Sequence, residues 1–443
     1  MTNKLPKNWD IVRINDIADF IRGVSYKKEK ARNVPKKEYI PIIRANNIQE
    51  QIMYEDLVYV PQSCVKAEQL LKNKDIVFAM SSGSKHLVGK AAKITPPMRI
   101  SFGTFCGAIR IKKEFNSDFV SYFFQTKEYR DYVSKISQGV NINNLKTAHI
   151  INIQLPFPSF NEQKRIVSTI EKFFKKIDDS VSQLHAAQNQ ICAFREAILG
   201  LYFNTDKNRV NLESVCDYIQ RGKSPQYTTT SSLPVINQKC IRWSCLQQEY
   251  LKYIAPSQFK DWSGERFVKE GDILWNSTGT GTIGRAYMLR KSDLKTKMVV
   301  DSHVTIVRAS QKQLLPQYAF YFIMSPYIQK KIEKMQAGST NQVELNRSII
   351  CKTLIPIIPI EEQKSVVTEI EKQFAVADKM QQAVDTALEQ AKQLKQAILK
   401  KAFAGKLVPQ DPSDEPAALL LEKIKAERNA AVHNYKLFKR KTK

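Results

Sequence analysis

The sequence has no long hydrophobic run. No stretch approaches the roughly 18 consecutive apolar residues that a membrane-spanning helix requires. The polar start, Met1–Asp10, lacks the apolar segment of a secretory signal, so we expect no signal peptide. These two absences argue against a membrane protein and against a secreted one.

Cysteine and histidine are sparse. The seven cysteines are scattered and odd in number, which fits reduced thiols in a cytoplasmic protein better than a disulfide framework. Cys240 and Cys245 lie close together, but no second pair of Cys or His follows at the spacing of zinc ligands. Because the five histidines are also widely separated, we expect no metal site.

Catalytic and cofactor motifs are missing as well. There is no Gly-x-Ser-x-Gly, no His-Glu-x-x-His and no carboxylate pair in a nuclease-like arrangement. Gly279–Gly284 matches the letters of the dinucleotide fingerprint, but Arg285–Arg290 favours a strand where the fingerprint needs a helix. Ser82–Lys90 has the wrong spacing for a phosphate-binding loop, and Ala91 stands where Ser or Thr would bind magnesium. We expect polar hairpin loops at both places and no cofactor bound by this chain.

Positive charge, in contrast, is in excess. The 443 residues include 69 Lys and Arg against 43 Asp and Glu, a formal net charge of +26. Such an excess suits the neutralisation of nucleic-acid phosphates and the release of their counterions. A basic protein that docks on an acidic partner remains an alternative.

An internal repeat with a period of about 200 residues organises the chain. Residues 161–164 return at 361–364, each time after an apolar run that contains proline, and Ala197–Leu199 returns at 397–399. The segments in between match more loosely. A duplicated frame with unlike loops suits a protein that recognises two different targets, although drift of an old duplication would leave the same pattern.

Each copy changes its secondary-structure pattern along its length. Residues 10–110 and 210–308 contain short apolar runs broken by Gly, Pro, Asn and Ser, such as Ile40–Ile43, and these runs predict strands. Residues 117–136 and 316–336 are rich in Tyr and Phe and favour helices. Each copy then passes through its proline-bearing run into a long helix.

The two long helices carry narrow apolar stripes. Apolar residues follow at steps of three and four over Ile166–Leu201 and Val366–Ile398, which is typical of a coiled-coil seam. Gly200 and Gly405 mark the expected ends, and about 40 residues give a rod of roughly 60 Å. Because neither stripe can form a globular core alone, we expect the two helices to pair, in antiparallel orientation.

The sequence thus predicts an α/β (α+β) protein with two globular domains, an antiparallel coiled coil of two long helices and a pseudo-two-fold internal repeat. The expected segments are a first domain, a central long helix, a second domain, a distal long helix and a C-terminal tail with a short helix: 1–155, 156–205, 206–357, 358–405 and 406–443.

Polar loop residues are the candidates for DNA contact. Arg suits guanine and Asn or Gln suits adenine, while hydroxyl and basic residues in Gly-rich loops suit the phosphate backbone. The candidates in copy one are Arg22, Arg44, Asn46, Asn47, Ser82, Ser84, Lys85, Lys90, Asn141 and Asn144. The candidates in copy two are Arg221, Lys223, Asn237, Gln238, Lys239, Thr278, Thr280, Thr282, Arg285, Asn341 and Gln342. Each one singly also fits an ordinary surface loop.

Taken together, these features resemble the specificity subunits of type I restriction–modification systems. The resemblance rests on the proline-to-Glu-Gln-Lys junctions at 155–164 and 355–364, the Ala-Ile-Leu helix ends at 197–199 and 397–399, and Ala404–Pro409. It covers nearly the whole chain. It implies two target-recognition domains, each recognising one half of a bipartite, asymmetric site in double-stranded DNA, with the paired helices as a spacer.

The resemblance also implies partners. Two modification subunits with adenine methyltransferase activity would dock along the helices and domains, and restriction subunits would join them for cleavage. S-adenosylmethionine, ATP and magnesium are then expected on the partners, and this chain would not itself be an enzyme. Base-contacting residues vary within the family, so none is transferred to this sequence.

Two other classes stay open. A stand-alone DNA-modifying enzyme predicts that the purified chain binds S-adenosylmethionine or cleaves DNA. A sequence-nonspecific coiled-coil DNA-binding or scaffold protein predicts salt-sensitive binding without discrimination between sequences.

Overall fold

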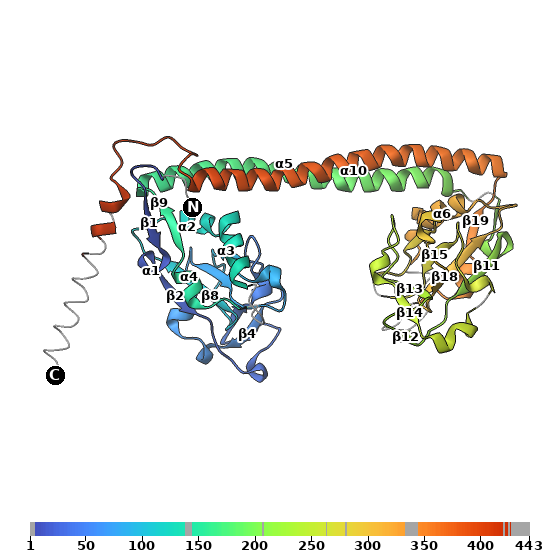
Figure 1. The fold of residues 1–443 in the computed structure, drawn as a ribbon, viewed down its shortest axis with the longest axis horizontal. Coiled ribbons are helices and arrows are strands. Elements are labelled where there is room, and N and C mark those ends of the chain that lie inside the picture. The colour runs from blue at the N-terminus through green and yellow to red at the C-terminus, as the bar shows by residue number, and fades with distance from the viewer. Residues whose placement is uncertain are drawn as a thin grey trace. The chain divides into compact units, whose positions relative to one another are not determined.

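The computed structural model describes residues 5–137, 144–205, 208–262, 264–279, 281–332, 344–419, 421–423 and 426. These residues form two compact units (Figure 1). Unit 1 lies within Met1–Gln183 and Ala387–Lys443, and unit 2 lies within Leu184–Thr386. Each long helix therefore contributes one part to each unit.

Unit 1 is built on an antiparallel sheet with the strand order β2-β8-β5-β6. These strands are Ala18–Arg22, Cys106–Ile111, Ile76–Ala79 and Ala91–Lys93. All four residues of β5 are buried because both faces of the sheet are covered. One face packs against α2 (Ser117–Phe123) and α3 (Lys127–Ser137). The other packs against a second sheet, β4-β3-β7, of Val58–Pro61, Tyr39–Ile43 and Ser101–Phe102.

Unit 2 repeats the order of the central sheet and adds one strand, β12, to the second sheet. Its central sheet has the order β11-β18-β15-β16, from Cys216–Arg221, Val304–Ala309, Ile273–Asn276 and Ala286–Met288. Its second sheet, β12-β14-β13-β17, consists of Tyr227–Thr228, Lys252–Ile254, Pro234–Ile236 and Val299–Val300. Helices α6 (Pro316–Met324), α7 (Pro326–Gln329) and α9 (Arg347–Cys351) complete it. The strands predicted from short apolar runs are confirmed, and so are the helices predicted from aromatic segments, except that residues 333–336 lie outside the described residues.

The proline-bearing runs form a short sheet in each unit. In unit 1, β1 (Asp10–Arg13) pairs antiparallel with β9 (Gln154–Phe157), next to the short helices α1 (Ile14–Ile17) and α4 (Thr147–Ile151). In unit 2, β10 (Arg209–Asn211) pairs with β19 (Leu354–Pro356). The long helices α5 (Phe160–Phe203) and α10 (Ile360–Phe403) begin a few residues later and contain 44 residues each.

The buried glutamine of the repeated Glu-Gln-Lys motif joins each long helix to its domain. Gln163 donates from Nε2 to the Pro158 carbonyl at 2.9 Å and accepts the Asn116 N–H at 3.2 Å, just before α2. Gln363 makes the corresponding contacts with the Ile358 carbonyl and the Leu315 N–H, at 2.8 and 2.9 Å. Because both side chains are fully buried, these bonds explain why the motif recurs.

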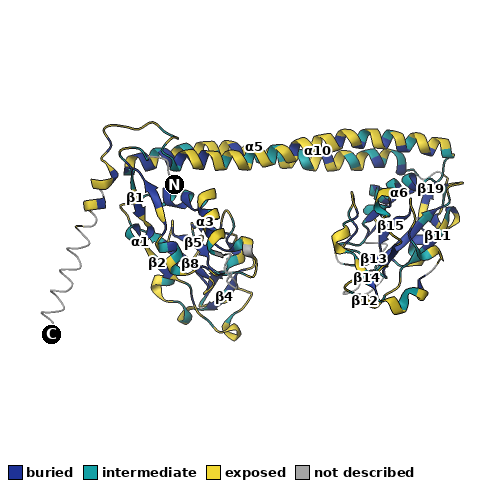
Figure 2. Ribbon diagram, in the orientation of Figure 1, coloured by how far each residue is buried: buried dark blue, intermediate teal, exposed yellow. Residues whose placement is uncertain are grey.

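The two long helices pair in antiparallel orientation, as predicted. Arg195 contacts Asp378 at 2.5 Å and Gln188 contacts Asp385 at 3.2 Å in unit 2, so residue numbers rise along one helix and fall along the other. In unit 1, a separate ion pair links α5 and α10. The seam itself is narrower than predicted, and exposed stretches run along both α5 and α10 (Figure 2). Several residues expected in the seam are exposed: Phe173, Phe194, Leu201, Met380 and Leu394.

The two glycines predicted to end the helices behave differently. Gly200 lies inside the last turn of α5, which continues to Phe203, so this predicted end was three residues early. Gly405 has a φ of +66° after the end of α10, and Lys406 donates to the Lys401 carbonyl at 2.9 Å. That bond is typical of a helix terminated by a left-handed glycine.

The described part of the C-terminal tail packs on unit 1. Residues 417–419 and 421–423 are helical. Ala417 and Leu421 are buried in the core of unit 1, and Asp414 forms an ion pair with Arg165 of α5 at 2.6 Å. Gln410 donates to the buried carboxylate of Glu162 at 2.6 Å. The tail therefore covers the first junction between domain and long helix.

Candidate nucleic-acid interface

One end of the central sheet has the same backbone frame in both units. In unit 1 the Met80 N–H, just after β5, donates to the Phe105 carbonyl at 2.9 Å, and the Met80 carbonyl accepts the Leu145 N–H at 2.7 Å. In unit 2 the same two bonds, at 2.9 and 2.8 Å, join Ser277, His303 and Leu345. Three loops thus meet at this end, and we call it the loop end of each unit.

A glycine lets a fourth segment cross closely at the loop end. A Cβ atom on Gly23 would lie 2.0 Å from the carbonyl oxygen of Gly103, and one on Gly222 would lie 2.1 Å from that of Val300. No side chain fits at such distances. This explains why the glycine recurs in both copies. The preceding residues, the candidates Arg22 and Arg221, are each the last of their strand and therefore lie at the loop end.

The structure brings the unit 2 candidates together. The Thr282 hydroxyl lies 3.3 Å from Oε1 of Gln238, and the buried Asn276 amide donates to the Gln238 and Thr282 carbonyls at 3.1 and 3.2 Å. Thr278 pairs with Glu344 in an isolated β-bridge, and Glu344 forms an ion pair with Arg221. Burial lowers the pKa of the Arg221 guanidinium, an effect that the nearby charge of Asp301 opposes.

The unit 1 candidates form a looser group. Asn144 pairs with Ser81 in an isolated β-bridge, and the Ser84 N–H donates to the Ser82 hydroxyl at 3.2 Å. Lys90 contacts the side chain of Gln49 at 2.5 Å, which places it near the short turn that holds the exposed Asn46. This group mixes hydroxyl, amide and basic side chains, as contacts to a DNA backbone and to base edges require.

Two candidate amide side chains, those of Asn47 and Asn237, are buried and form hydrogen bonds with the backbone of their own unit. Asn47 is 2% exposed, accepts the Arg44 N–H at 2.9 Å and donates to the Glu55 carbonyl at 2.8 Å. Asn237 is 5% exposed, accepts the Lys239 N–H at 2.9 Å and donates to a backbone carbonyl at 2.6 Å. In this conformation both side chains stabilise turns. Their exposed neighbours, Asn46 and Lys239, are better placed for contact with a ligand.

The other candidates vary in how they are held. Arg44 donates to the Asp56 carbonyl at 2.8 Å, and Arg285 donates to the Gly281 carbonyl at 2.8 Å. The exposed Lys223 donates to the Asp261 carbonyl at 3.2 Å. Four candidates lie outside the described residues, and the side chain of a fifth is not described either: Asn141, Thr280, Asn341, Gln342 and Lys85.

The Gly-rich segment of copy two is a hairpin loop. Gly279, Gly281 and Gly284 all have positive φ, between +77° and +102°, and β16 follows at Ala286. β16 pairs antiparallel with β15. The prediction of a strand after this segment is confirmed, so no helix N-terminus faces the loop as the dinucleotide fingerprint requires.

Comparison with known proteins agrees with the repeat. A model of the type I restriction modification DNA specificity domain matches the chain twice, at residues 6–186 and 204–396. The chain belongs to this family. It is 32% identical to the EcoKI specificity subunit from Escherichia coli K12, over 97% of each chain. It is 30% identical to the StySPI specificity subunit from Salmonella potsdam, over 96% of each chain.

The fold of these two specificity domains is also known from a solved structure. A chain studied for complex assembly and conformational transition of the type I R-M system matches with a TM-score of 0.66 at 18% identity. The match covers 91% of this chain and 100% of that one. The predicted fold class is thereby confirmed.

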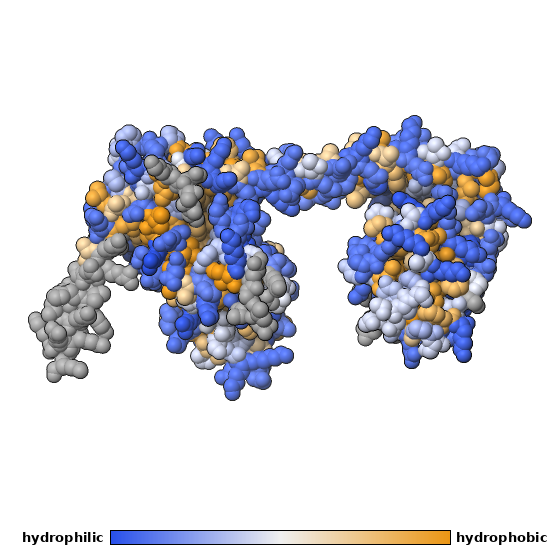
Figure 3. Space-filling model, in the orientation of Figure 1, coloured by the Kyte–Doolittle hydropathy of each residue, from blue (hydrophilic) through white to orange (hydrophobic). Residues whose placement is uncertain are grey.

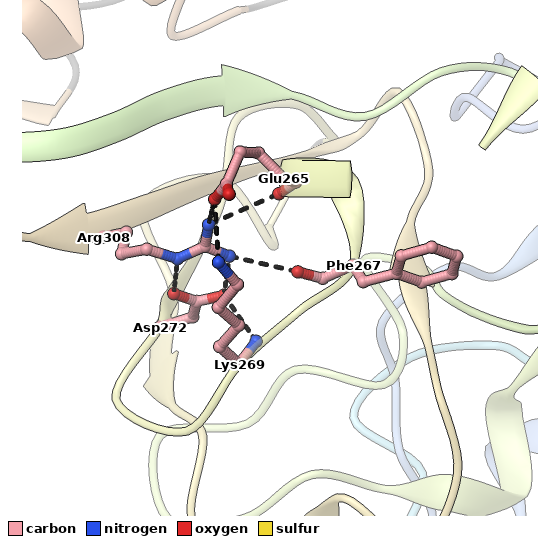
Figure 4. A network of polar contacts seen from close by, with 5 residues as sticks. All are labelled: Glu265, Phe267, Lys269, Asp272 and Arg308. Atoms are coloured by element: carbon pink, nitrogen blue, oxygen red, sulfur yellow. Dashed lines mark hydrogen bonds and ion pairs between the residues drawn. The ribbon is translucent and has the colours of Figure 1, made fainter. Parts of the chain in front are cut away.

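An acidic residue and an arginine form a buried pair in each specificity domain, which the sequence analysis missed. Asp272 accepts Nε and Nη2 of Arg308 at 2.7 and 2.8 Å (Figure 4). Burial alone would lower the pKa of Arg308, but the hydrogen bonds and charge of Asp272 raise it overall. Asp75 and Arg110 form the same pair in unit 1, at 2.9 and 2.6 Å. The signal available in the sequence was the recurrence of both residues: Asp75 and Asp272 each precede an apolar run, and Arg110 and Arg308 each lie within one.

The face shown in Figure 3 carries both hydrophilic and hydrophobic areas. Hydrophilic residues cover most of the visible face of α5 and α10 (Figure 3). Among the described residues, no helix combines the length and the apolar character needed to cross a membrane. Within the same residues, no three His, Cys, Asp or Glu side chains are grouped so that they could hold a metal ion.

Proposed function

We propose that this chain is the DNA sequence-recognition subunit of a type I restriction–modification complex. The observation that carries the proposal is the double match to the specificity domain, together with similarity over 97% of the chain to a type I specificity subunit. Each unit recognises one half of a bipartite, asymmetric site in double-stranded DNA. The net charge of +26 supplies the phosphate contacts that such binding needs.

The loop end of each unit is the proposed DNA-contacting surface. It presents different side chains on one repeated backbone frame, which is what recognition of two different half-sites requires. The described candidates that line or adjoin it are Arg22, Asn46, Ser82, Ser84, Lys90 and Asn144 in unit 1, and Arg221, Lys223, Gln238, Lys239, Thr278, Thr282 and Arg285 in unit 2.

The long helices are proposed to set the half-site spacing and to dock the modification subunits. When two recognition domains bind the same face of DNA, the centres of their half-sites lie about one helical turn, roughly 10 bp, apart. Large apolar side chains are exposed along both helices, including Phe173, Leu201 and Met380. Because single exposed apolar residues are common on protein surfaces, the docking role rests on the similarity to specificity subunits and not on this exposure.

Catalysis is proposed to belong to the partners. Modification subunits would supply S-adenosylmethionine and adenine methylation in the cytoplasm, and restriction subunits would supply ATP- and magnesium-dependent cleavage. The similarity to specificity subunits supports this division. It also disfavours the alternative of a sequence-nonspecific scaffold.

The proposal is tested by mapping methyladenine across the genome of the host with and without this gene. We expect one bipartite motif to lose methylation when the gene is deleted. The purified chain alone should neither bind S-adenosylmethionine nor cleave DNA. Persistence of every motif after deletion, or methylation by the chain alone, would overturn the proposal.

A further inference from the structure

The loop end of each unit carries one side chain that neither the sequence candidates nor the family match include. We propose that Phe105 and His303 are specificity-determining residues, and that each contacts a base in the half-site recognised by its own unit. This inference rests on the proposed function and adds to it the residues through which the two units differ.

The two residues occupy the same position in the repeated frame. The carbonyls of Phe105 and His303 accept the N–H of Met80 and Ser277, respectively, both at 2.9 Å. Each residue also stands just before the strand that lies between two neighbours in the central sheet, β8 or β18. The position is therefore central at the loop end, with the Gly-rich loop on one side and the Arg-Gly crossing on the other.

The backbone at this position is held rigidly in unit 1. The Cys106 N–H donates to the Gly103 carbonyl at 2.8 Å, which closes a tight turn. Within that turn the Thr104 hydroxyl donates to the Val24 carbonyl at 3.0 Å. The turn in unit 2 is closed in the same way, because the Val304 N–H donates to the Asp301 carbonyl at 3.1 Å, and the Ser302 hydroxyl lies 2.7 Å from that of Ser224. A side chain presented from such a frame loses little conformational freedom when it binds.

Phe105 is an aromatic residue that projects into solvent. Its exposed fraction is 68%, although the residues around it in the sequence, Gly103 and Cys106, are held in the turn and the sheet. Single exposed apolar residues are common on surfaces, so exposure alone decides nothing. At the centre of a rigid loop end flanked by DNA-contact candidates, however, a phenyl ring matches the C5-methyl group of thymine.

His303 presents a polar group at the equivalent position. Its side chain is 45% exposed, and Nδ1 lies 3.2 Å from Oδ2 of Asp301, a carboxylate that is 3% exposed. Asp301 is itself held by the Tyr227 hydroxyl at 3.1 Å and by the His303 N–H at 2.9 Å. Because Nδ1 is buried against Asp301, Nε2 is the ring nitrogen that the exposed part of the side chain presents. A ring nitrogen can take part in hydrogen bonds with the polar edges of bases in the major groove.

The test uses the full chain expressed with its modification subunits, with methyladenine mapping as the readout. Phe105→Ala should relax one base position in one half-site, and His303→Ala should relax one position in the other half-site. We expect at least a roughly fivefold loss of discrimination at that position, the lower end of the range for a base contact. The reciprocal variants, Phe105→His and His303→Phe, should change the preferred base in the same two places.

Matched controls lie beyond the opposite ends of the same strands. Lys113 and Lys312 are exposed and follow β8 and β18, so Lys113→Ala and Lys312→Ala should leave the motif unchanged. Thermal unfolding of each purified variant verifies that it folds.

Folded variants that methylate the wild-type motif with unchanged discrimination would overturn the inference and leave the proposed function standing. Uniform loss of methylation without relaxed specificity would overturn it too. If no bipartite motif depends on the wild-type chain, the proposed function itself fails.

Discussion

Replacing Asp272 with Ala should destabilise unit 2 by about 3–5 kcal/mol, because it leaves a buried guanidinium without its carboxylate. Asp272 is fully buried, and the Arg308 side chain is only 12% exposed, so water has little access to replace the lost oxygens. Arg308 would keep the Phe267 carbonyl at 3.0 Å and the carboxylate of Glu265 as partners. These remaining contacts place the expected loss toward the lower end of the range.

Urea denaturation followed by tryptophan fluorescence measures this change in the full chain. Trp262 and Trp275 are 4% and 0% exposed in unit 2, so their emission reports its unfolding. With a slope of about 2 kcal/mol/M, a loss of 3 kcal/mol lowers the midpoint by about 1.5 M.

Two further variants separate the buried pair from its surroundings. Lys269→Ala breaks only an exposed ion pair with Glu265 and should leave the midpoint unchanged. Adding Arg308→Met to Asp272→Ala removes the unpaired charge and should recover part of the stability. A midpoint for Asp272→Ala within about 0.3 M of the wild type, equivalent to less than about 1 kcal/mol, would refute the reasoning.

Three other predictions concern the first junction, the loop ends and the long helices. Burial raises the pKa of the Glu162 carboxyl, although the hydrogen bonds from Trp9 and Gln410 oppose this shift. The stability that Glu162 contributes to the folded state is therefore fully present below the ordinary pKa of 4.5, and it is lost as the pH rises through the folded-state pKa. Glu162→Gln should therefore raise the unfolding free energy at pH 7 and leave it unchanged near pH 3.5, as urea titrations at the two values would reveal. Gly23→Ala should cost about 1–3 kcal/mol in thermal unfolding because its Cβ would overlap a carbonyl oxygen, whereas Gly83→Ala, with nothing within 4 Å, should cost nothing measurable. Inserting equal lengths into α5 and α10 should change the number of unspecified base pairs in the methylated motif while both half-site sequences stay the same.

The features that the sequence predicted well are those with a local pattern. The apolar run Ile76–Ala79 follows Asp75, leads within two residues into Ser81 and Ser82, and is fully buried in the central sheet. The long helices have no proline, and only Gly200 interrupts them near one end, so their extent follows from the repeat alone. The repeat also predicted that the two domains share one topology.

The features that it predicted poorly depend on three-dimensional packing. Apolar residues spaced three or four apart do not show which of them an antiparallel partner helix covers. The pattern therefore did not predict that Phe173 and Leu201 are exposed. Asn47 was chosen for its amide, yet the amide is used by a carbonyl eight residues away. Phe105 and His303 are different kinds of residue, so comparison of the two copies of the repeat did not identify them as equivalent positions. The backbone bonds to Met80 and Ser277 made the equivalence visible.

This equivalence bears on how one frame can recognise different DNA sequences. The same kinds of residue recur in the buried parts of both units. They are a glycine where the fourth segment crosses, an Asp-Arg pair at the central sheet and a glutamine at the start of the long helix. Changes there cost several kcal/mol, because they leave cavities, overlaps or unpaired charges. Phe105 and His303 instead project from backbone whose carbonyl groups are fixed by the N–H groups of Met80 and Ser277. Substitution at such a position alters the surface chemistry while stability changes by only about 0.5 kcal/mol. Recognition can therefore diverge between the two units while the fold stays constant, and Phe105→His should unfold at nearly the temperature of the wild type.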